Sequence, residues 1–284
     1  FHGEDVAPMA RDRHLNGAPR GEEPPWPSLA RLVTFRPGEM TIITGYSHSG
    51  KSAFLDHLLV SLIQDHGWPL GVYSPENYPV EAHFNTFVTL LAGRAAEGSY
   101  KMGQEEYERH AATVSAAISW VYPEEDHTVE ALLARVKVLV FRRGIRAFVV
   151  DPWNEMDHTA PKGLREDQYI SMALGKIRRF ARAHRVHVFI VAHPTNPQKD
   201  PKTKKYPVPT LHNIAGGANW KNKADNGLVV YRDFDTGDDQ TIISVQKVKF
   251  KDVGRSGTCI LRYEWKTGRF FDQNLGEFAG GPKA

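Results

Sequence analysis

A glycine-rich loop between an apolar run and an amphipathic run is the feature that most constrains this chain. The loop spans 45–52 within MTIITGYSHSGKSAFLDHLLVSLI and matches the pattern G-x-x-x-x-G-K-[ST]. Its glycines let backbone N–H groups turn inward around phosphate oxygens, while the lysine and the final hydroxyl reach the phosphates and Mg²⁺. A strand before and a helix after make a chance match in a turn the weaker interpretation. The sequence therefore predicts a phosphate-binding loop and, with it, an α/β fold.

This phosphate loop supplies the first candidate binding residues. Lys51 is expected to reach the β- and γ-phosphates, and the Ser52 hydroxyl is expected to bind Mg²⁺. The first turn of the following helix adds its own attraction for anions. The candidate nucleotide-binding residues of the loop are Gly45, Ser47, Ser49, Gly50, Lys51, Ser52 and Ala53.

Strand and helix patterns alternate along most of the chain. Short runs of apolar and β-branched residues predict strands at 40–44, 70–74, 146–151, 186–193, 228–232, 241–248 and 258–265. Amphipathic spacing predicts helices at 53–67, 129–144 and 167–185. Continuous apolar strands separated by helices indicate a mainly parallel central sheet flanked by helices on both faces. The last pair of strands is expected to be antiparallel.

Composition sets further limits on function. The 36 basic and 33 acidic residues leave a net charge of +3, which permits a nucleic-acid partner without indicating one. A single cysteine, Cys259, excludes an internal disulfide and a cysteine-rich zinc site. No run approaches ~18 apolar residues and no secretion signal opens the chain, so no membrane partner is expected.

Three regions are expected along the chain. Residues 1–30 are rich in proline, glycine and charge, which predicts a flexible and mostly extended linker. Residues 31–272 carry the alternating pattern and predict a single domain, and residues 273–284 predict a tail. Because the chain begins with phenylalanine, we expect it to be a piece of a longer protein.

Three polar side chains follow apolar strands, at the sheet edge where ligands bind in such folds. Asp151 can contact magnesium, with helix capping as the alternative. Glu76 can orient and deprotonate an attacking water, although a glutamate beside a proline is ordinarily an exposed turn residue. His193 can touch a γ-phosphate or serve as a hydrogen-bonded structural residue. By spacing alone these alternatives stay open.

A set of segments in a particular order carries a family resemblance. The segments are GYSHSGKS, SPEN, VVDPWNEMDH and IVAHPTN, followed by YPVPTLHNIAGGANWKNKADNGLVVYRDF and VQKVKFKDVG. Over residues 31–272 this set resembles the RecA-like motor domain of hexameric replicative DNA helicases, on the Twinkle-like and phage primase-helicase branch. Bacterial replicative helicases usually have glutamine at the position of His193. The resemblance implies a P-loop NTPase that hydrolyses ATP to move along DNA.

The resemblance also implies a role for each strand-end residue. Glu76 would be the catalytic base, Asp151 the acidic partner of Mg²⁺, and His193 the sensor of the γ-phosphate. Arg232 and Tyr263 match positions that sandwich the nucleotide base, a task that suits a guanidinium plane and an aromatic ring. A surface ion pair and a half-buried strand aromatic are the alternatives for these two residues.

The segment QKVKFK would act on the nucleotide of a neighbouring subunit. Lys247 resembles the lysine that approaches the γ-phosphate in trans, and Lys249 stands where the family often has an arginine finger. Lysine brings the charge but lacks the planar fork of arginine. Either Lys249 acts less rigidly, or a nearby arginine such as Arg255 replaces it. A solvated basic strand edge is the structural alternative.

By the same resemblance, residues 206–225 would face the channel of a ring and bind single-stranded DNA. Glycines there allow close backbone approach to phosphates, and amide and lysine side chains offer hydrogen bonds and charge. Trp220 suits stacking on a base, but we favour a packing role for it. A second candidate channel loop is 157–168, with Lys162 and Arg165. The candidate DNA contacts are Gly216, Gly217, Asn219, Lys221 and Lys223.

Several expectations rest on the resemblance alone. ATP or another NTP and Mg²⁺ are the expected cofactors, and single-stranded DNA and other copies in a homo-hexamer are the expected partners, with 5′-to-3′ movement. A primase domain is expected upstream, and the segment WPSLARL (26–32) is expected to form a linker helix that contacts a neighbour. We expect a cytoplasmic or nucleoid-associated protein of a phage or bacterium, with a mitochondrial-type relative as the alternative. The competing functions are a recombinase-like, loader or switch ATPase that binds DNA without unwinding it.

Overall fold

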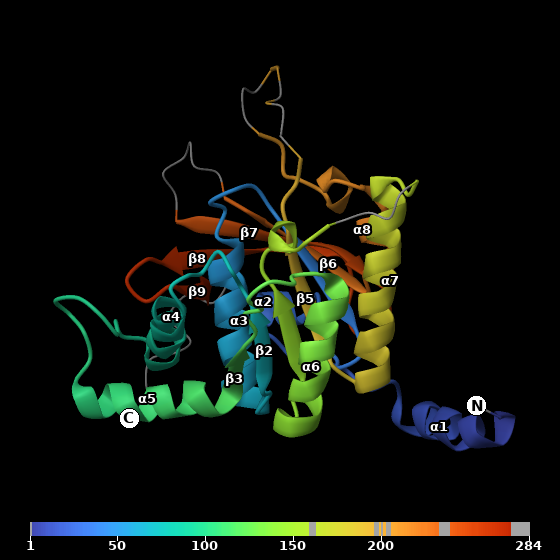
Figure 1. Ribbon diagram of the computed structural model, residues 1–284, viewed down its shortest axis with the longest axis horizontal. Coiled ribbons are helices and arrows are strands. Elements are labelled where there is room, and N and C mark those ends of the chain that lie inside the picture. Colours follow the sequence, from blue (N-terminus) through green and yellow to red (C-terminus); the bar gives the residue numbers. More distant parts are fainter. Residues whose placement is uncertain are drawn as a thin grey trace.

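The computed structural model describes residues 2–158, 163–195, 199, 201–202, 206–232 and 239–273. Within these residues the strands form one sheet of nine, in the order β3-β2-β4-β5-β1-β6-β7-β8-β9 (Figure 1). The strands are β1 (Met40–Thr44), β2 (Leu70–Tyr73), β3 (Ile118–Trp120), β4 (Ala147–Val150), β5 (His187–Ala192), β6 (Asn226–Tyr231), β7 (Gln240–Val248), β8 (Gly257–Glu264) and β9 (Arg269–Asp272).

The strands from β3 to β6 in that order are parallel, and β7, β8 and β9 are added antiparallel. β1 pairs in parallel with β5 and β6, so that Ile43 lies opposite Val191 and Leu228. All residues of β1 are buried, which fits an apolar strand covered on both faces. β6 pairs with β7, β7 with β8 and β8 with β9 in the antiparallel sense. The predicted mainly parallel sheet with antiparallel C-terminal strands is confirmed.

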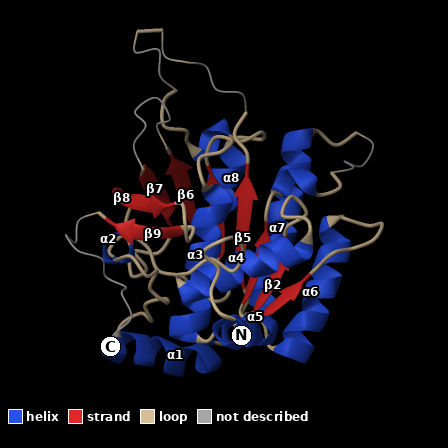
Figure 2. Ribbon diagram, turned by 90° about the vertical axis from the view of Figure 1, so that its left-hand side faces the viewer, coloured by secondary structure: helices blue, strands red, loops and turns tan. Residues whose placement is uncertain are grey.

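Helices cover both faces of the sheet. α3 (Lys51–His66) and α4 (Val80–Ala92) pack on one face, and α6 (Val129–Arg143) and α7 (Glu166–His184) pack on the other (Figure 2). Ile42 and Ile43 enter these two different cores, because successive residues of a strand point to opposite faces. The described helices are α1 (Gly3–Asn16), α2 (Pro27–Ala30), α3 (Lys51–His66), α4 (Val80–Ala92), α5 (Gln104–Ala117), α6 (Val129–Arg143), α7 (Glu166–His184) and α8 (Ala218–Lys223), with short 3₁₀ helices η1 (Trp153–Glu155) and η2 (Leu211–Asn213).

The N-terminal region differs from the mostly extended linker predicted for residues 1–30. Residues 3–16 form α1, which has no buried residue and lies beside the main body (Figure 1). Acidic residues in its first turn and basic residues in its last turn complement the helix dipole and favour the helix. The predicted helix at 26–32 is present as α2, but Trp26 and Leu29 are buried in the core of this same chain. Where the domain boundary falls stays a prediction, and residues 274–284 of the predicted tail lie outside the described residues.

A fully buried histidine begins β5. His187 Nδ1 donates to the Arg36 carbonyl oxygen at 2.7 Å, and Nε2 lies 2.8 Å from Thr41 Oγ1. Because a carbonyl oxygen can only accept, the neutral ring carries its proton on Nδ1 and accepts the Thr41 hydroxyl. Burial lowers the pKa of His187 to about 4, although the hydrogen bond to Arg36 and the charge of Asp225 oppose the change.

Because His187 is buried in its neutral form, we expect the stability of the fold to fall in acid. The unfolded state takes up the His187 proton below about pH 6.5, but the native state resists it until about pH 4. His187 should therefore make its full contribution to the free energy of unfolding above pH 6.5. Between pH 6.5 and pH 4 this contribution should fall by about 1.4 kcal/mol per pH unit. Urea unfolding at pH 7, 6, 5 and 4.5 measures the slope. His187→Asn should make it shallower, and His14→Asn on exposed α1 should not. Equal slopes in all three proteins would contradict the assignment.

Candidate active site

The phosphate loop at 45–52, called the P-loop from here on, connects β1 to α3 and requires glycine at its first position. A Cβ on Gly45 would lie 2.1 Å from the Val230 carbonyl oxygen and 2.7 Å from Ser49 Oγ, so no side chain fits. Gly50, directly before α3, has φ 86° and ψ 22°, a left-handed conformation that favours glycine. The two glycines let the loop fold tightly against β6 and lead directly into the N-terminus of α3.

Two polar side chains of the loop are buried in a way that fits phosphate. Ser49 Oγ is buried and has no hydrogen-bond partner among the described residues. Lys51 is 5% exposed, and its Nζ donates to the Tyr46 carbonyl oxygen at 2.9 Å. Burial lowers the pKa of Lys51 against the opposing charges of Asp151 and Glu76. An unpaired buried hydroxyl and a buried ammonium at a helix N-terminus are suited to phosphate oxygens.

Asp151 directly follows β4 and is 4% exposed. It accepts a hydrogen bond from the Ser52 side chain. Burial raises the pKa of the Asp151 carboxyl to about 7; Asp56 and Glu76 add to the rise, whereas Ser52 and Lys51 oppose it. A hydroxyl and a buried carboxyl that touch each other are oxygen donors of the kind that Mg²⁺ prefers.

Glu76 and His193 follow the strands on either side of β4. Glu76 lies in a turn after β2, and its charge acts on both Lys51 and Asp151. His193 directly follows β5; burial and the charge of Lys51 both lower its pKa. The structure therefore brings Lys51, Asp151, Glu76 and His193 to one edge of the sheet, because β1, β2, β4 and β5 run parallel in one block.

Arg232 and Tyr263 lie close together beside the P-loop. Arg232 Cζ stands 5.9 Å from the centre of the Tyr263 ring. Tyr263 packs against Phe270 with ring centres 4.9 Å apart, and Phe270 Cζ would lie 3.8 Å from a Cβ on Gly50. The predicted pair is therefore connected through Phe270 to the entrance of α3. Sequence analysis missed Phe270, which belongs to the short strand β9.

Lys247 and Lys249 lie away from this edge. Val248, between them on β7, stands opposite Asn226, the first residue of β6. Both lysines are therefore at the edge where the parallel strands begin, whereas the P-loop follows the end of β1. Lys247 Nζ donates to the carbonyl oxygens of Lys221 and Asn222, and Lys249 Nζ donates to Asp225 Oδ1 at 3.1 Å. Arg255 is exposed, and its backbone N–H donates to the Leu32 carbonyl oxygen.

The candidate DNA segment is partly a helix rather than a loop. Residues 218–223 form α8, with Gly216 and Gly217 at φ 80° and 40° before it. The Asn219 side-chain amide donates to the Asp167 carbonyl oxygen at 2.9 Å, so this amide already has a structural partner.

Of the remaining side chains of this segment, the tryptophan is packed inside the domain and the two lysines are only partly covered. Trp220 is 1% exposed and meets Trp153 edge to face, with its Nε1 donating to the Ala215 carbonyl oxygen at 2.6 Å, so the favoured packing role is confirmed. Lys221 and Lys223 are half-buried. In the second candidate loop, Arg165 pairs with Asp167 at 2.7 Å, while Lys162 lies outside the described residues.

A match to a protein family decides the class of this chain. Residues 20–199 match the AAA_25 family, described as an AAA domain. The chain belongs to the AAA_25 family. Membership of this family of P-loop ATPases implies that the chain binds a nucleotide. No described helix of this AAA_25 chain is long and apolar enough to cross a membrane.

Known relatives of this AAA_25 chain include replicative helicases. It is 34% identical over 260 residues to the Twinkle homolog protein, chloroplastic/mitochondrial, of Arabidopsis thaliana. The match covers 87% of the chain and 36% of the relative, so the chain spans little more than a third of that protein. The predicted resemblance to the motor domain of replicative helicases, on the Twinkle-like branch, is confirmed.

Solved structures show the same RecA-like fold. One of them, described as an ATPase domain, has a TM-score of 0.78 at 15% identity, with 96% of this AAA_25 chain and 99% of that chain covered. A DnaB-like replicative helicase, solved in a study of its interactions with primase, has a TM-score of 0.73 at 17% identity, covering 95% and 68%. A KaiC-like protein from Pyrococcus horikoshii has a TM-score of 0.58 at 13% identity, covering 88% and 97%.

Sequence analysis missed a second buried group beside the P-loop of this AAA_25 chain. Asp56 on α3 and His83 on α4 are both buried, with Oδ1 and Nε2 3.4 Å apart. Trp120 Nε1 lies 3.4 Å from the other nitrogen of His83. The signal for Asp56 was available, because it follows Ser52 by four residues and shares its helix face. His83 had none, since only the packing of α4 on α3 brings it there.

We expect the Arg232–Tyr263 pair to contribute to the affinity of the protein for nucleotide. Replacing Tyr263 with alanine removes a ring that can stack on a base, and should weaken nucleotide binding by about 10-fold or more. Titration with a fluorescent ATP analogue measures the change. Trp265→Ala is the matched control, because Trp265 lies just past the same strand but is 77% exposed. Unchanged affinity in the Tyr263 variant would place the base elsewhere.

Proposed function

We propose that this chain is the ATP-driven motor domain of a replicative DNA helicase, which hydrolyses NTP at the subunit interfaces of a hexameric ring. The observation that carries the proposal is a divided site. Lys51, Asp151, Glu76 and His193 meet at one edge of the sheet, whereas Lys247 and Lys249 lie at the other. Because one chain cannot bring both edges to one nucleotide, a head-to-tail assembly completes the site.

The first edge has the groups that phosphoryl transfer needs. Lys51, the Ser49 hydroxyl and the N-terminus of α3 hold the triphosphate. Ser52 and Asp151 would hold Mg²⁺, which would supply positive charge to offset that of the phosphate oxygens. Glu76 lies at the same edge and takes a proton from the water that attacks the γ-phosphate in line.

His193 connects the nucleotide to the candidate DNA segment. It precedes Pro194, which forms an isolated bridge with Ile214, and the Thr195 N–H donates to the Asn213 carbonyl oxygen at 2.7 Å. Tyr46 of the P-loop also donates from its hydroxyl to the Pro207 carbonyl oxygen at 2.8 Å. Loss of the γ-phosphate therefore acts at both ends of 206–214, the segment that leads through 215–217 into α8. The proposed DNA contacts are Gly216, Gly217, Asn219, Lys221 and Lys223.

The names of the relatives support the partners that we propose. One solved relative is described as a replicative helicase that interacts with primase, and the curated relative is a Twinkle homolog of chloroplasts and mitochondria. We propose single-stranded DNA, a homo-hexamer and an upstream primase domain for the full-length protein, with movement from 5′ to 3′ and action at a nucleoid.

The first test measures ATP turnover with and without single-stranded DNA, together with particle mass in the presence of a non-hydrolysable ATP analogue. Strong stimulation by DNA and a ring of about six subunits are expected. Unwinding of a forked duplex then separates a helicase from a recombinase-like, loader or switch ATPase. A full-length protein that stays monomeric, with slow turnover that DNA does not change, would overturn the proposal.

A further inference from the structure

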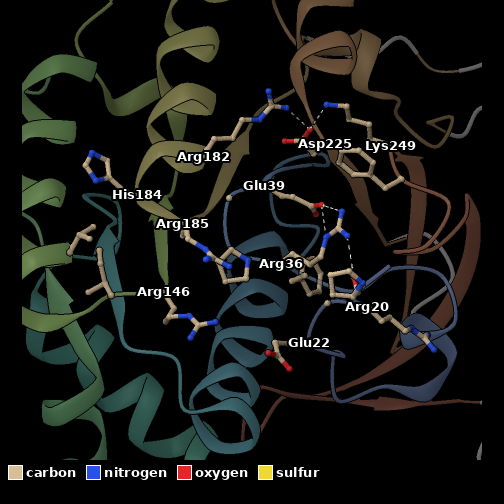
Figure 3. Close-up of a pocket in the computed structure, with 18 of the residues that line it drawn as sticks. Arg20, Glu22, Arg36, Glu39, Arg146, Arg182, His184, Arg185, Asp225 and Lys249 are labelled. Carbon is tan, nitrogen blue, oxygen red and sulfur yellow. Dashed lines mark hydrogen bonds and ion pairs between the residues drawn. The ribbon is translucent and has the colours of Figure 1, made fainter. Parts of the chain in front are cut away.

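A basic cavity of about 1040 Å³, whose lining residues are drawn in Figure 3, lies where the parallel strands begin. The P-loop lies at the other edge of the sheet, because it follows the end of β1. Asp225 lines the cavity, and its Oδ2 accepts the backbone N–H of Met40, the first residue of β1. The cavity therefore lies beside the start of β1. Five arginines, Lys249 and His184 line the cavity, against three acidic side chains. The cavity therefore has an excess of positive charge and suits an anionic ligand.

Buried carboxylates hold particular cations in this cavity. Asp225 is 1% exposed, and its Oδ1 is approached by Lys249 Nζ at 3.1 Å and by Arg182 Nη2 at 3.5 Å. Figure 3 shows the two side chains reaching the same carboxylate from different elements. Asp225 thus places a guanidinium from α7 beside the lysine that follows β7. The positive charges of Arg182 and Lys249 can lie close together because the buried carboxylate of Asp225 lies between them.

Arg182, which Asp225 holds beside Lys249, is placed to take a further anion. Its contact with Asp225 uses one nitrogen, and its other N–H groups have no partner among the described residues. Arg36 is already held by Glu39 and by the Pro19 carbonyl oxygen. Arg146 lies over the Trp68 ring, 5.7 Å from its centre. Arg255, the alternative suggested by sequence, does not line the cavity.

We propose that Arg182 acts in trans beside Lys249 and binds the γ-phosphate of a nucleotide held on the P-loop of a second copy of this chain. The inference rests on the proposed function and names the arginine that the segment QKVKFK lacks. A guanidinium offers two parallel N–H donors to phosphate oxygens, which lysine does not. In a head-to-tail ring, an edge opposite the P-loop can meet the P-loop of the neighbour.

The test is complementation between two inactive proteins. Arg182→Ala keeps its P-loop, and Lys51→Ala keeps its Arg182, so each alone should turn over ATP roughly 100-fold more slowly than the wild type. In an equal mixture about a quarter of the interfaces join an intact P-loop to an intact Arg182, as random assembly of a head-to-tail ring requires. Turnover in the mixture should therefore rise well above that of either variant.

The control mixture contains Arg182→Ala with the double variant Lys51→Ala/Arg182→Ala. It should stay inactive, since no subunit then offers Arg182. Arg142→Ala, on the exposed end of α6, should turn over ATP as the wild type does. Arg182→Lys keeps the ion pair with Asp225 but lacks the two parallel N–H donors of a guanidinium. It should lose turnover completely and keep the thermal stability of the wild type. This result would show that Arg182 recognises phosphate rather than supports the fold.

The outcomes distinguish this inference from the function on which it rests. Rings of normal mass with no recovery in the first mixture, while the wild type hydrolyses ATP, would overturn the role of Arg182 alone. Recovery in both mixtures would also overturn it, because the activity would then come from another residue. A wild type that neither assembles nor hydrolyses ATP would overturn the proposed function and this inference together.

Discussion

Replacing Glu76 with glutamine is expected to lower ATP turnover by at least ~100-fold while nucleotide binding persists. Glutamine keeps the size of the side chain and its ability to hydrogen-bond, but it cannot accept a proton from water. Binding should persist because the groups that hold the triphosphate, Lys51 and the N-terminus of α3, are unchanged. Steady-state turnover and titration with a fluorescent ATP analogue measure the two effects separately.

A matched control comes from the same region of the chain. Glu81 is exposed in the first turn of α4, so Glu81→Gln tests removal of a nearby negative charge away from the P-loop. It should leave turnover close to the wild-type rate. Turnover retained by the Glu76 variant would show that another group activates the water, and Asp151 would be the next carboxylate to replace.

Replacing Trp26 with alanine is expected to destabilise the domain by about 3–5 kcal/mol, the usual cost of removing a large buried aromatic. Trp26 is 2% exposed and stacks on Phe54 of α3 with ring centres 5.1 Å apart. Its Nε1 also donates to the Phe270 carbonyl oxygen at 2.8 Å. Truncation therefore leaves a cavity and removes this hydrogen bond at the same place. Urea unfolding followed by circular dichroism measures the loss.

Two further variants make this result specific. Trp26→Phe keeps most of the apolar contact and loses only the hydrogen bond, so it should cost about 1–3 kcal/mol. Leu15→Ala, on α1, removes a side chain that is 68% exposed and should change the stability very little. A Trp26→Ala protein as stable as the wild type would show that residues before 31 do not support the folded domain.

Local sequence patterns were sufficient for the central elements of the fold. β1, α3, β4, α7 and β5 have continuous apolar or amphipathic patterns, and the P-loop fixes the connection of β1 to α3. α5 was missed because only Val114 of this helix is buried, which leaves little apolar periodicity to detect. β9 was missed because it is short and its first residue is charged. Trp26 was assigned to a linker because the prolines around it are more typical of extended chain.

The candidate site was predictable only where a motif or a strand end marks it. Lys51, Asp151, Glu76 and His193 follow strands, so their convergence follows from a parallel sheet. The grouping of Lys249 and Arg182 around Asp225 does not, because the three residues come from separate elements and meet only when β6 and β7 pair next to the end of α7. Likewise, the contact of Asp56 with His83 depends on how α4 packs against α3.

The closure of the fold by Trp26 and β9 has a consequence for how the protein is made. The Ser28 N–H donates to Asp272 Oδ2 at 2.7 Å, and Trp26 donates to the Phe270 carbonyl oxygen, so the first and last parts of the packed chain hold each other. Phe270 also packs on α3, next to Gly50. The P-loop is therefore synthesised well before Phe270, and it acquires its neighbouring wall only when Phe270 has left the ribosome. Between these two points of translation, the nucleotide site of the nascent chain is unfinished.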